Sequence, residues 1–320
     1  MLFRSAYHQP LYALGTSSET WFDQSGQQAA LFATLATTAR PQTWRDRVTV
    51  WHKTIEGSLD QGELIKETSG PHSCPPGEKA VPVQLTETGH VLDVGSYHVL
   101  QKRGSALVLG SLGAAWLDKQ IRQLKLSIGF NTILHRPDES VVKARWHFLR
   151  FGEVYVGVRA TGMVLGKRKP VRCVTKNRYL RIEVPLVTGR PVKVTQEFRE
   201  WCDFGYVFEI ASKAECGSFA RFCRECLDCS WEFYHCFYRT SRYQGRHGEL
   251  QIIDSVAAGT VRFMAIDGVV EPRVKLAATG LNPKLTQLFP DGHRVKQRRL
   301  MYSPDFIGSP FYKLRSHVVE

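Results

Sequence analysis

The sequence predicts an all-β protein, a large antiparallel β-sandwich with one amphipathic helix near residues 218–234. Short segments of alternating apolar and polar residues, rich in β-branched and aromatic side chains, recur about every ten to fifteen residues. Gly and Asn separate these segments, and almost no helical stretches lie between them. Parallel α/β folds need a crossover helix after nearly every strand, so that class is excluded. An antiparallel sandwich is the remaining architecture.

The expected strands cover most of the chain. Two hairpins are predicted. In the first, the turn 102–105 joins the strands 96–101 and 106–110, and in the second, the turn 150–153 joins the strands 145–149 and 154–158. The segment 67–78 is rich in turn-forming residues and is expected to be a loop. The other expected strands are 46–52, 87–93, 124–128, 179–184, 205–210, 249–253 and 261–266, the last leading into the turn Asp267-Gly268.

The helix is predicted from a cap and a repeat. Ser218 is a suitable capping residue, and apolar residues then recur with a helical period up to position 230. Cys223, Cys226 and Cys229 lie along one stripe of this helix, with a spacing that also resembles a metal or iron–sulfur signature. Zinc sites usually place such pairs on tight turns, and the chain has no second pair elsewhere. We therefore expect core thiols and no metal.

Composition indicates a globular, basic protein. The 320 residues include 43 Lys or Arg and 30 Asp or Glu, a formal net charge of +13, and 43% are hydrophobic. No run reaches the roughly 20 apolar residues that span a bilayer, so no membrane partner is expected. The first residues lack the apolar stretch of a signal peptide. With no repeat and no clear linker, residues 1–320 are expected to form a single domain.

The positive charge is clustered in two places. Seven cations and no acid lie between positions 167 and 181, and a second cluster lies at 294–299. Such clusters attract polyanions, although solvated charges on a hairpin or an edge strand explain the same pattern. Arg145 precedes Trp146, a pair suited to stacking on a sugar ring and equally to a half-buried strand edge. The candidate substrate-binding residues are Lys167, Arg168, Lys169, Arg172 and Arg145.

Other candidate site residues have less support. Tyr97 and His98 could act as acid and base, but adjacent strand residues point to opposite faces, so packing roles are expected. His8, His72 and His293 show no paired spacing typical of a metal site, and neither a metal nor a cofactor is expected. No nucleophile elbow, Walker loop or dinucleotide-binding glycine motif occurs, so hydrolase, kinase and dehydrogenase functions have no support.

Four segments of the chain are similar, in their order, to segments of a known protein family. They are the opening 7–15, the paired strands within 97–110, the strand and helix start within 205–222, and the closing stretch 248–268. Together they resemble the C-terminal β-sandwich region of heparinase II/III-like and related polysaccharide lyase-like proteins, over about two thirds of the chain. The opening is similar to the segment that follows the helical toroid in that family. The cysteine-rich helix and the basic charge balance depart from the family pattern.

The resemblance implies an (α/α) toroid followed by a supersandwich-like β domain, of which this chain would hold only the second part. In such lyases a base removes the proton α to the sugar carboxylate, a cation neutralises that carboxylate, and a Tyr is commonly the acid. Most of these groups come from the toroid, so no catalytic residue is transferred here. We expect recognition of an acidic polysaccharide, without catalysis by this chain alone. The family would imply secretion, but the missing signal and the thiols indicate otherwise, so localisation stays open.

Two other functions fit the sequence. The chain could be a basic β-rich nucleic-acid-binding module with residues 167–181 as its footprint, although Tyr179 is the sole aromatic residue in that segment. It could instead be a structural partner that completes a neighbouring domain or subunit, such as the toroid.

Overall fold

The computed structural model describes residues 4–17, 31–59, 64–66, 97–110, 112, 117–118, 120–176, 179–235, 238–255 and 261–270. These residues form three antiparallel sheets, which we name A, B and C. Sheet A has the order β1 (Arg4–Gln9), β2 (Tyr12–Ser17), β3 (Leu31–Ala36), β4 (Arg47–Leu59), β8 (Gln120–Asn131), β14 (Tyr179–Val187) and β13 (Arg172–Lys176), with β5 (Leu64–Lys66) on β4 and β15 (Val192–Lys193) on β8.

The other two sheets come from the middle and the end of the described chain. Sheet B has the order β6 (Tyr97–Lys102), β7 (Ser105–Gly110), β16 (Cys202–Ser212), β11 (Val154–Val164), β10 (Trp146–Phe151) and β9 (Glu139–Lys143), with β12 (Lys167–Arg168) on β11. Sheet C runs β17 (Ser230–His235), β18 (Tyr238–Gly245), β19 (Gly248–Ser255), β20 (Val261–Ile266) and β21 (Val269–Val270). The short helices are η2 (Trp44–Asp46), α1 (Gln196–Glu200), α2 (Lys213–Cys216) and α3 (Phe219–Asp228).

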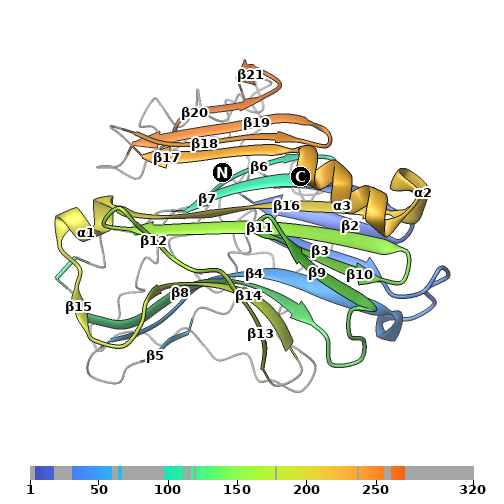
Figure 1. The fold of residues 1–320 in the computed structure, drawn as a ribbon, viewed down its shortest axis with the longest axis horizontal. Helices are drawn as coiled ribbons and strands as arrows, with labels where there is room; N and C mark the ends of the chain where they lie inside the picture. The colour runs from blue at the N-terminus through green and yellow to red at the C-terminus, as the bar shows by residue number, and fades with distance from the viewer. Residues whose placement is uncertain are drawn as a thin grey trace, which may run out of the picture.

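The predicted all-β sandwich is confirmed, with an additional layer. Sheet B lies between sheet A and sheet C, and α3 lies beside sheet C over the same face of sheet B (Figure 1). The alternation in the sequence predicted strands with one face buried and the other exposed to solvent. Trp146 and His147 are neighbours on β10 and point to opposite faces, but both are buried. Strand β16 is buried along its whole length. A strand covered on both faces needs no polar alternation, which is why sheet B lacks it.

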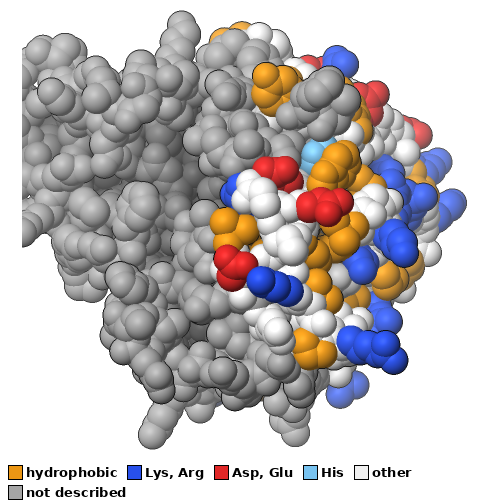
Figure 2. All heavy atoms as spheres, turned by 90° about the vertical axis from the view of Figure 1, so that its left-hand side faces the viewer, with side chains coloured by type: hydrophobic (Ala, Val, Ile, Leu, Met, Phe, Trp, Pro, Cys, Tyr) orange, Lys and Arg blue, Asp and Glu red, His pale blue; other side chains and the backbone are white. Residues whose placement is uncertain are grey.

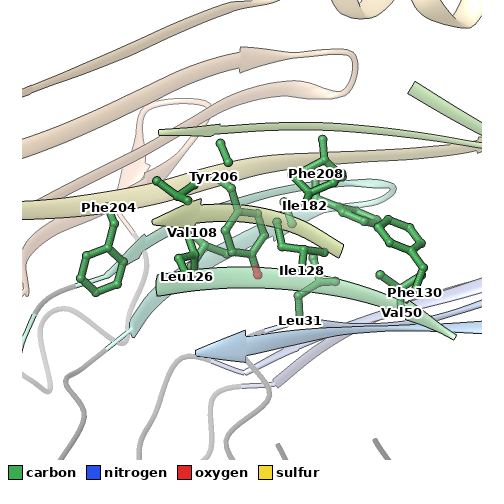
Figure 3. Packing of buried hydrophobic residues seen from close by; sticks show 14 of the residues in the cluster. Leu31, Val50, Val108, Leu126, Ile128, Phe130, Ile182, Phe204, Tyr206 and Phe208 are labelled. Atoms are coloured by element: carbon green, nitrogen blue, oxygen red, sulfur yellow. The ribbon is translucent and has the colours of Figure 1, made fainter. Parts of the chain in front are cut away.

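Two apolar cores hold the layers together. The first lies between sheets A and B, where Leu126 and Ile128 of β8 pack toward Tyr206 and Phe208 of β16 (Figure 3). The second lies between sheet B and the layer of sheet C and α3. There Phe222 of α3 packs edge-on against the Phe148 ring, with 6.2 Å between ring centroids. Burial of these large side chains is the main stabilising contribution to the sandwich.

The predicted helix exists but is shorter than expected. Ser218 caps it, because its hydroxyl accepts a hydrogen bond from the Arg221 N–H at 3.2 Å. The expectation that it continues to position 234 is wrong, since α3 ends at Asp228 and β17 begins at Ser230. Residues 230–235 alternate between exposed and half-buried, and this period of two is typical of a strand. The aromatic residues in this segment suit both periods, so the helical repeat was extended too far.

Most expected strands lie within observed ones, including both predicted hairpins. The expected strand 87–93, the loop 67–78 and the basic cluster at 294–299 lie outside the described residues. The single-domain assignment of 1–320 stays a prediction for the same reason.

Candidate functional site

Three of the five candidate cations lie on one tight hairpin at the edge of sheet B. Strand β11 turns through Leu165 and Gly166, both in the left-handed region at φ 48° and 73°, and returns as β12. Lys167 and Arg168 on β12 are exposed, and the Lys169 N–H donates to the Gly162 carbonyl at 2.7 Å. The hydrogen-bonded backbone therefore fixes the positions of these cations, and strand alternation points Arg168 to the opposite face of sheet B from Lys167 and Lys169. We name Lys167, Arg168 and Lys169 the basic hairpin.

The structure brings Arg145 close to this hairpin. Arg145 is exposed in the turn before β10, with φ 69°, and the next residue along, Trp146, is paired with Arg159 of β11. Arg145 therefore lies level with position 160 of β11 and Lys169 with position 162. Strands β10 and β12 both pair with the same edge of β11, β10 with residues 154–159 and β12 with residues 163 and 164. Residues far apart in the sequence thus form one row of positive charge.

Arg172 lies on the other sheet. After β12 the chain crosses to sheet A, where Arg172 starts the edge strand β13 and is exposed, opposite Glu183 of β14. It therefore extends the positive charge from sheet B to the edge of sheet A. The side chains of Lys176 and Arg178, from the same sequence cluster, are not among those described.

The five candidate cations lack acidic partners among the described residues, unlike several cations that are buried or half-buried. Lys125, Arg239 and Arg246 each pair with a carboxylate within 3.0 Å. Within the described part of the chain, no ion pair involves Lys167, Arg168, Lys169, Arg172 or Arg145. Burial, followed by the nearby charge of Arg145, lowers the pKa of Arg159, which lies 5.8 Å from the Trp231 ring centroid. Lys and Arg side chains gather along the right-hand margin of the face in Figure 2.

Sequence reasoning missed an aromatic residue beside the basic hairpin. Trp201 follows α1, is 39% exposed, and its backbone carbonyl accepts a hydrogen bond from the Leu165 N–H at 2.9 Å. Its ring stacks on His235 with 4.0 Å between centroids and 6° between planes. Thr195 caps α1 by accepting from the Phe198 N–H at 3.1 Å, which a Thr followed by Gln-Glu could have signalled.

A buried charged cluster joins sheets B and C behind this surface. His235 Nδ1 lies 2.8 Å from Asp203 Oδ2, and Arg239 binds both Asp254 oxygens at 2.9 and 2.8 Å. Burial raises the pKa of Asp203, while His235 and Arg239 oppose that shift. The side chains of Asp203, His235, Arg239 and Asp254 are at most 2% exposed. A substrate in solution cannot reach them, so the cluster is structural in this conformation.

The other candidate residues from the sequence, a tyrosine and four histidines, are not brought together by the described part of the structure. His98 is buried, 3.8 Å from Asp254, as expected for a packing role. The Tyr97 side chain is not described, His8 is exposed on β1, and His72 and His293 lie outside the described residues. In the part of the chain that the structure describes, no three His, Cys, Asp or Glu residues come together as a metal site.

The cysteines in α2, in α3 and at the end of α3 are packed as small apolar residues. Cys216 and Cys226 are buried and Cys223 and Cys229 are half-buried, all as free thiols. Desolvation raises the pKa of Cys216, Cys223 and Cys229 to about 11, and that of Cys226 further. The four thiols are therefore protonated at neutral pH. This agrees with the interpretation as core residues.

We expect these four thiols to resist alkylation in the folded protein. A shift of about two pKa units lowers the thiolate fraction about a hundredfold near pH 8, and burial slows access further. Brief iodoacetamide treatment followed by peptide mass spectrometry should leave them largely unmodified until urea unfolds the chain. Fast native alkylation of Cys223 or Cys226, or a melting temperature that falls with a zinc chelator, would contradict this assignment.

Comparison with known proteins gives no family. The sequence matches no model of a known protein family, and no curated protein matches it. The resemblance to heparinase II/III-like proteins therefore stays a prediction from the segments quoted above. No helix in the described residues is long and apolar enough to cross a membrane.

Proposed function

We propose that this chain is a binding module for an acidic polysaccharide, the β-sandwich part of a polysaccharide lyase-like protein. The observation that carries the proposal is the set of five exposed or half-exposed cations without acidic partners on one flank of the sandwich. A cation that is not neutralised within the fold is available to a ligand carboxylate or sulfate. Rigid hairpins fix the spacing of these charges, which reduces the entropy lost on binding.

We propose a binding role without catalysis by this chain alone. Lyase chemistry needs a base and an acid that reach the sugar. Among the described residues, the Asp203–His235 pair has suitable chemistry, but its side chains are at most 2% exposed. Any cleavage would therefore use groups from a partner, such as a toroid domain or subunit.

Single-stranded nucleic acid is the second candidate ligand. Exposed Trp201 beside the basic hairpin is the observation in its favour, because bases stack on aromatic rings. Sequence-tolerant single-strand sites use several stacking residues in succession, and the described flank offers one. A polysaccharide carrying carboxylates is therefore the better match.

Reversing the charge of the basic hairpin tests the proposal. The variant Lys167→Glu, Arg168→Glu, Lys169→Glu should bind a polygalacturonate about a hundredfold more weakly than wild type at 0.1 M salt, since three contacts are lost. The measurement is an isothermal titration with the intact chain, after thermal unfolding shows that the variant is folded.

The matched control makes the same change in net charge elsewhere. Arg103, Arg136 and Arg224 are exposed, and all three lie toward the opposite end of sheet B. Their triple replacement by Glu should change the affinity only a few-fold. Equal losses in the two triple variants would contradict a defined site, because only the total charge would then matter.

A further inference from the structure

The strongest unassigned feature is the exposed indole of Trp201. Trp51 and Trp146 are buried in the cores, whereas Trp201 is 39% exposed. His235 covers one face of the indole as a parallel stack. The exposed surface of Trp201 therefore belongs to its other face and its edges. A large apolar ring open on one face in a rigid setting is typical of a stacking site for a flat ligand.

The ring is held from several directions. The His235 ring supports it, and Asp203 anchors that imidazole at 2.8 Å. The Leu165 N–H fixes the Trp201 backbone to the turn of the basic hairpin, and the Trp201 N–H donates to the Glu197 carbonyl at 2.9 Å. Such support limits the rotation of the indole before a ligand arrives, so little entropy is lost on contact.

Trp201 lies between an acidic segment and a basic segment of the chain. Helix α1, which leads into Trp201, carries Glu197 and Glu200 together with the buried Arg199, a net negative charge of one. The backbone bond from Leu165 places the basic hairpin next to Trp201 as well, beginning two residues later at Lys167. An anionic ring on the indole is repelled from α1 and attracted to the hairpin. The site therefore orients a charged ligand as well as holding it.

The arrangement of aromatic residues favours a sugar. Tyr234 and Tyr238 are also exposed, but they lie on the outward face of sheet C. On β17 the inward positions are Trp231, Phe233 and His235, which alternate with the exposed Tyr234. Trp201 is thus a single platform, which holds one ring at a time, while base stacking along a single strand needs a series.

We infer that Trp201 is the ring-stacking subsite of the proposed polysaccharide-binding surface. One uronate ring lies on the open face of the indole, with its carboxylate toward the basic hairpin and away from α1. His235 and Asp203 are positioning residues for the indole. This inference rests on the proposed function and adds a residue and an orientation to it.

The test compares Trp201→Ala with Trp201→Phe and with the control Tyr234→Ala. Titration with a galacturonate hexamer should show affinity lower by about tenfold to a hundredfold for Trp201→Ala, with partial recovery in Trp201→Phe. Tyr234→Ala should bind like wild type. Repeating the titration at several salt concentrations should give the same slope for Trp201→Ala as for wild type, because stacking releases no counterions.

Each outcome separates this inference from the proposed function. Unchanged affinity in Trp201→Ala, combined with loss of binding in the basic-hairpin variant, overturns the inference and leaves the binding module in place. No effect in either variant overturns both. A weaker dependence of affinity on salt concentration in Trp201→Ala than in wild type overturns the inference. It would mean that the substitution had removed contacts between cations and the ligand. Tighter, Trp201-dependent binding of a single-stranded oligonucleotide than of the hexamer overturns the assignment to a sugar.

Discussion

Replacing Arg239 by Met is expected to lower the free energy of unfolding by about 3–5 kcal/mol. Arg239 is 1% exposed and binds both oxygens of Asp254, which is fully buried. Its Nε also lies 3.9 Å from Asp203. Without the guanidinium, two buried carboxylates lose their shared cation, and desolvated charge without a partner is costly. Urea unfolding at pH 7 measures the loss directly.

A control on the same strand separates burial from charge. Arg242 of β18 is exposed and pairs with Glu249 at 2.6 Å. Arg242→Met should therefore leave the stability nearly unchanged, since exposed pairs are solvated. The destabilisation caused by Arg239→Met should shrink as the pH falls, because protonation removes the stranded negative charge. A loss below about 1 kcal/mol, or one independent of pH, would contradict the role of Arg239 as the shared cation.

Glu209 should make the protein less stable as the pH rises from about 4.5 to about 7. Burial raises the pKa of Glu209 to about 7, while the Tyr243 hydroxyl at 2.7 Å and the Arg246 charge oppose that shift. The folded state then binds the proton more tightly than the unfolded state does. The stabilisation is fully present below the unfolded pKa and is lost as the pH passes through the folded pKa. A shift of this size corresponds to about 3 kcal/mol.

The measurement is the difference between two stability curves. Asp203 also has a raised pKa, so the wild-type curve includes a contribution of the same sign. Subtracting the Glu209→Gln curve, obtained by urea unfolding at several pH values from 4 to 8, isolates Glu209. Glu232→Gln, an exposed change on β17, should follow the wild-type curve. Parallel curves for wild type and Glu209→Gln would contradict the assignment.

The strands were predictable because their signal is local. Alternation and turn residues identified the hairpin 145–158, which the structure forms as β10 and β11. The third layer was not predictable in this way, because burial of the second face of sheet B depends on α3 and sheet C, which come later in the chain than most strands of sheet B. The only sign of this layer in the sequence is a continuous apolar run such as Ala106–Leu109 in β7, which is buried on both faces.

The candidate site was predictable only in part. A run of cations is visible in any sequence, so Lys167, Arg168 and Lys169 could be proposed from charge alone. The position of Arg145 in line with this run depends on the pairing of β10 and β12 with the same side of β11. The stack of Trp201 on His235 joins residues 34 positions apart and has no sequence pattern. Long-range contacts of this kind are fixed by the sheet order, which the local signal does not specify.

The central claim, a defined surface for an acidic polysaccharide, is tested most directly by binding of the intact chain across a salt series. The ligands are polygalacturonate, an uncharged polysaccharide and a single-stranded oligonucleotide. We predict saturable binding of polygalacturonate that survives about 0.2 M salt, with weak binding of the other two, because counterion release alone fades steeply over that range. Equal binding of both polyanions that disappears at this salt concentration would contradict the claim, since the net charge of +13 would then act without a site.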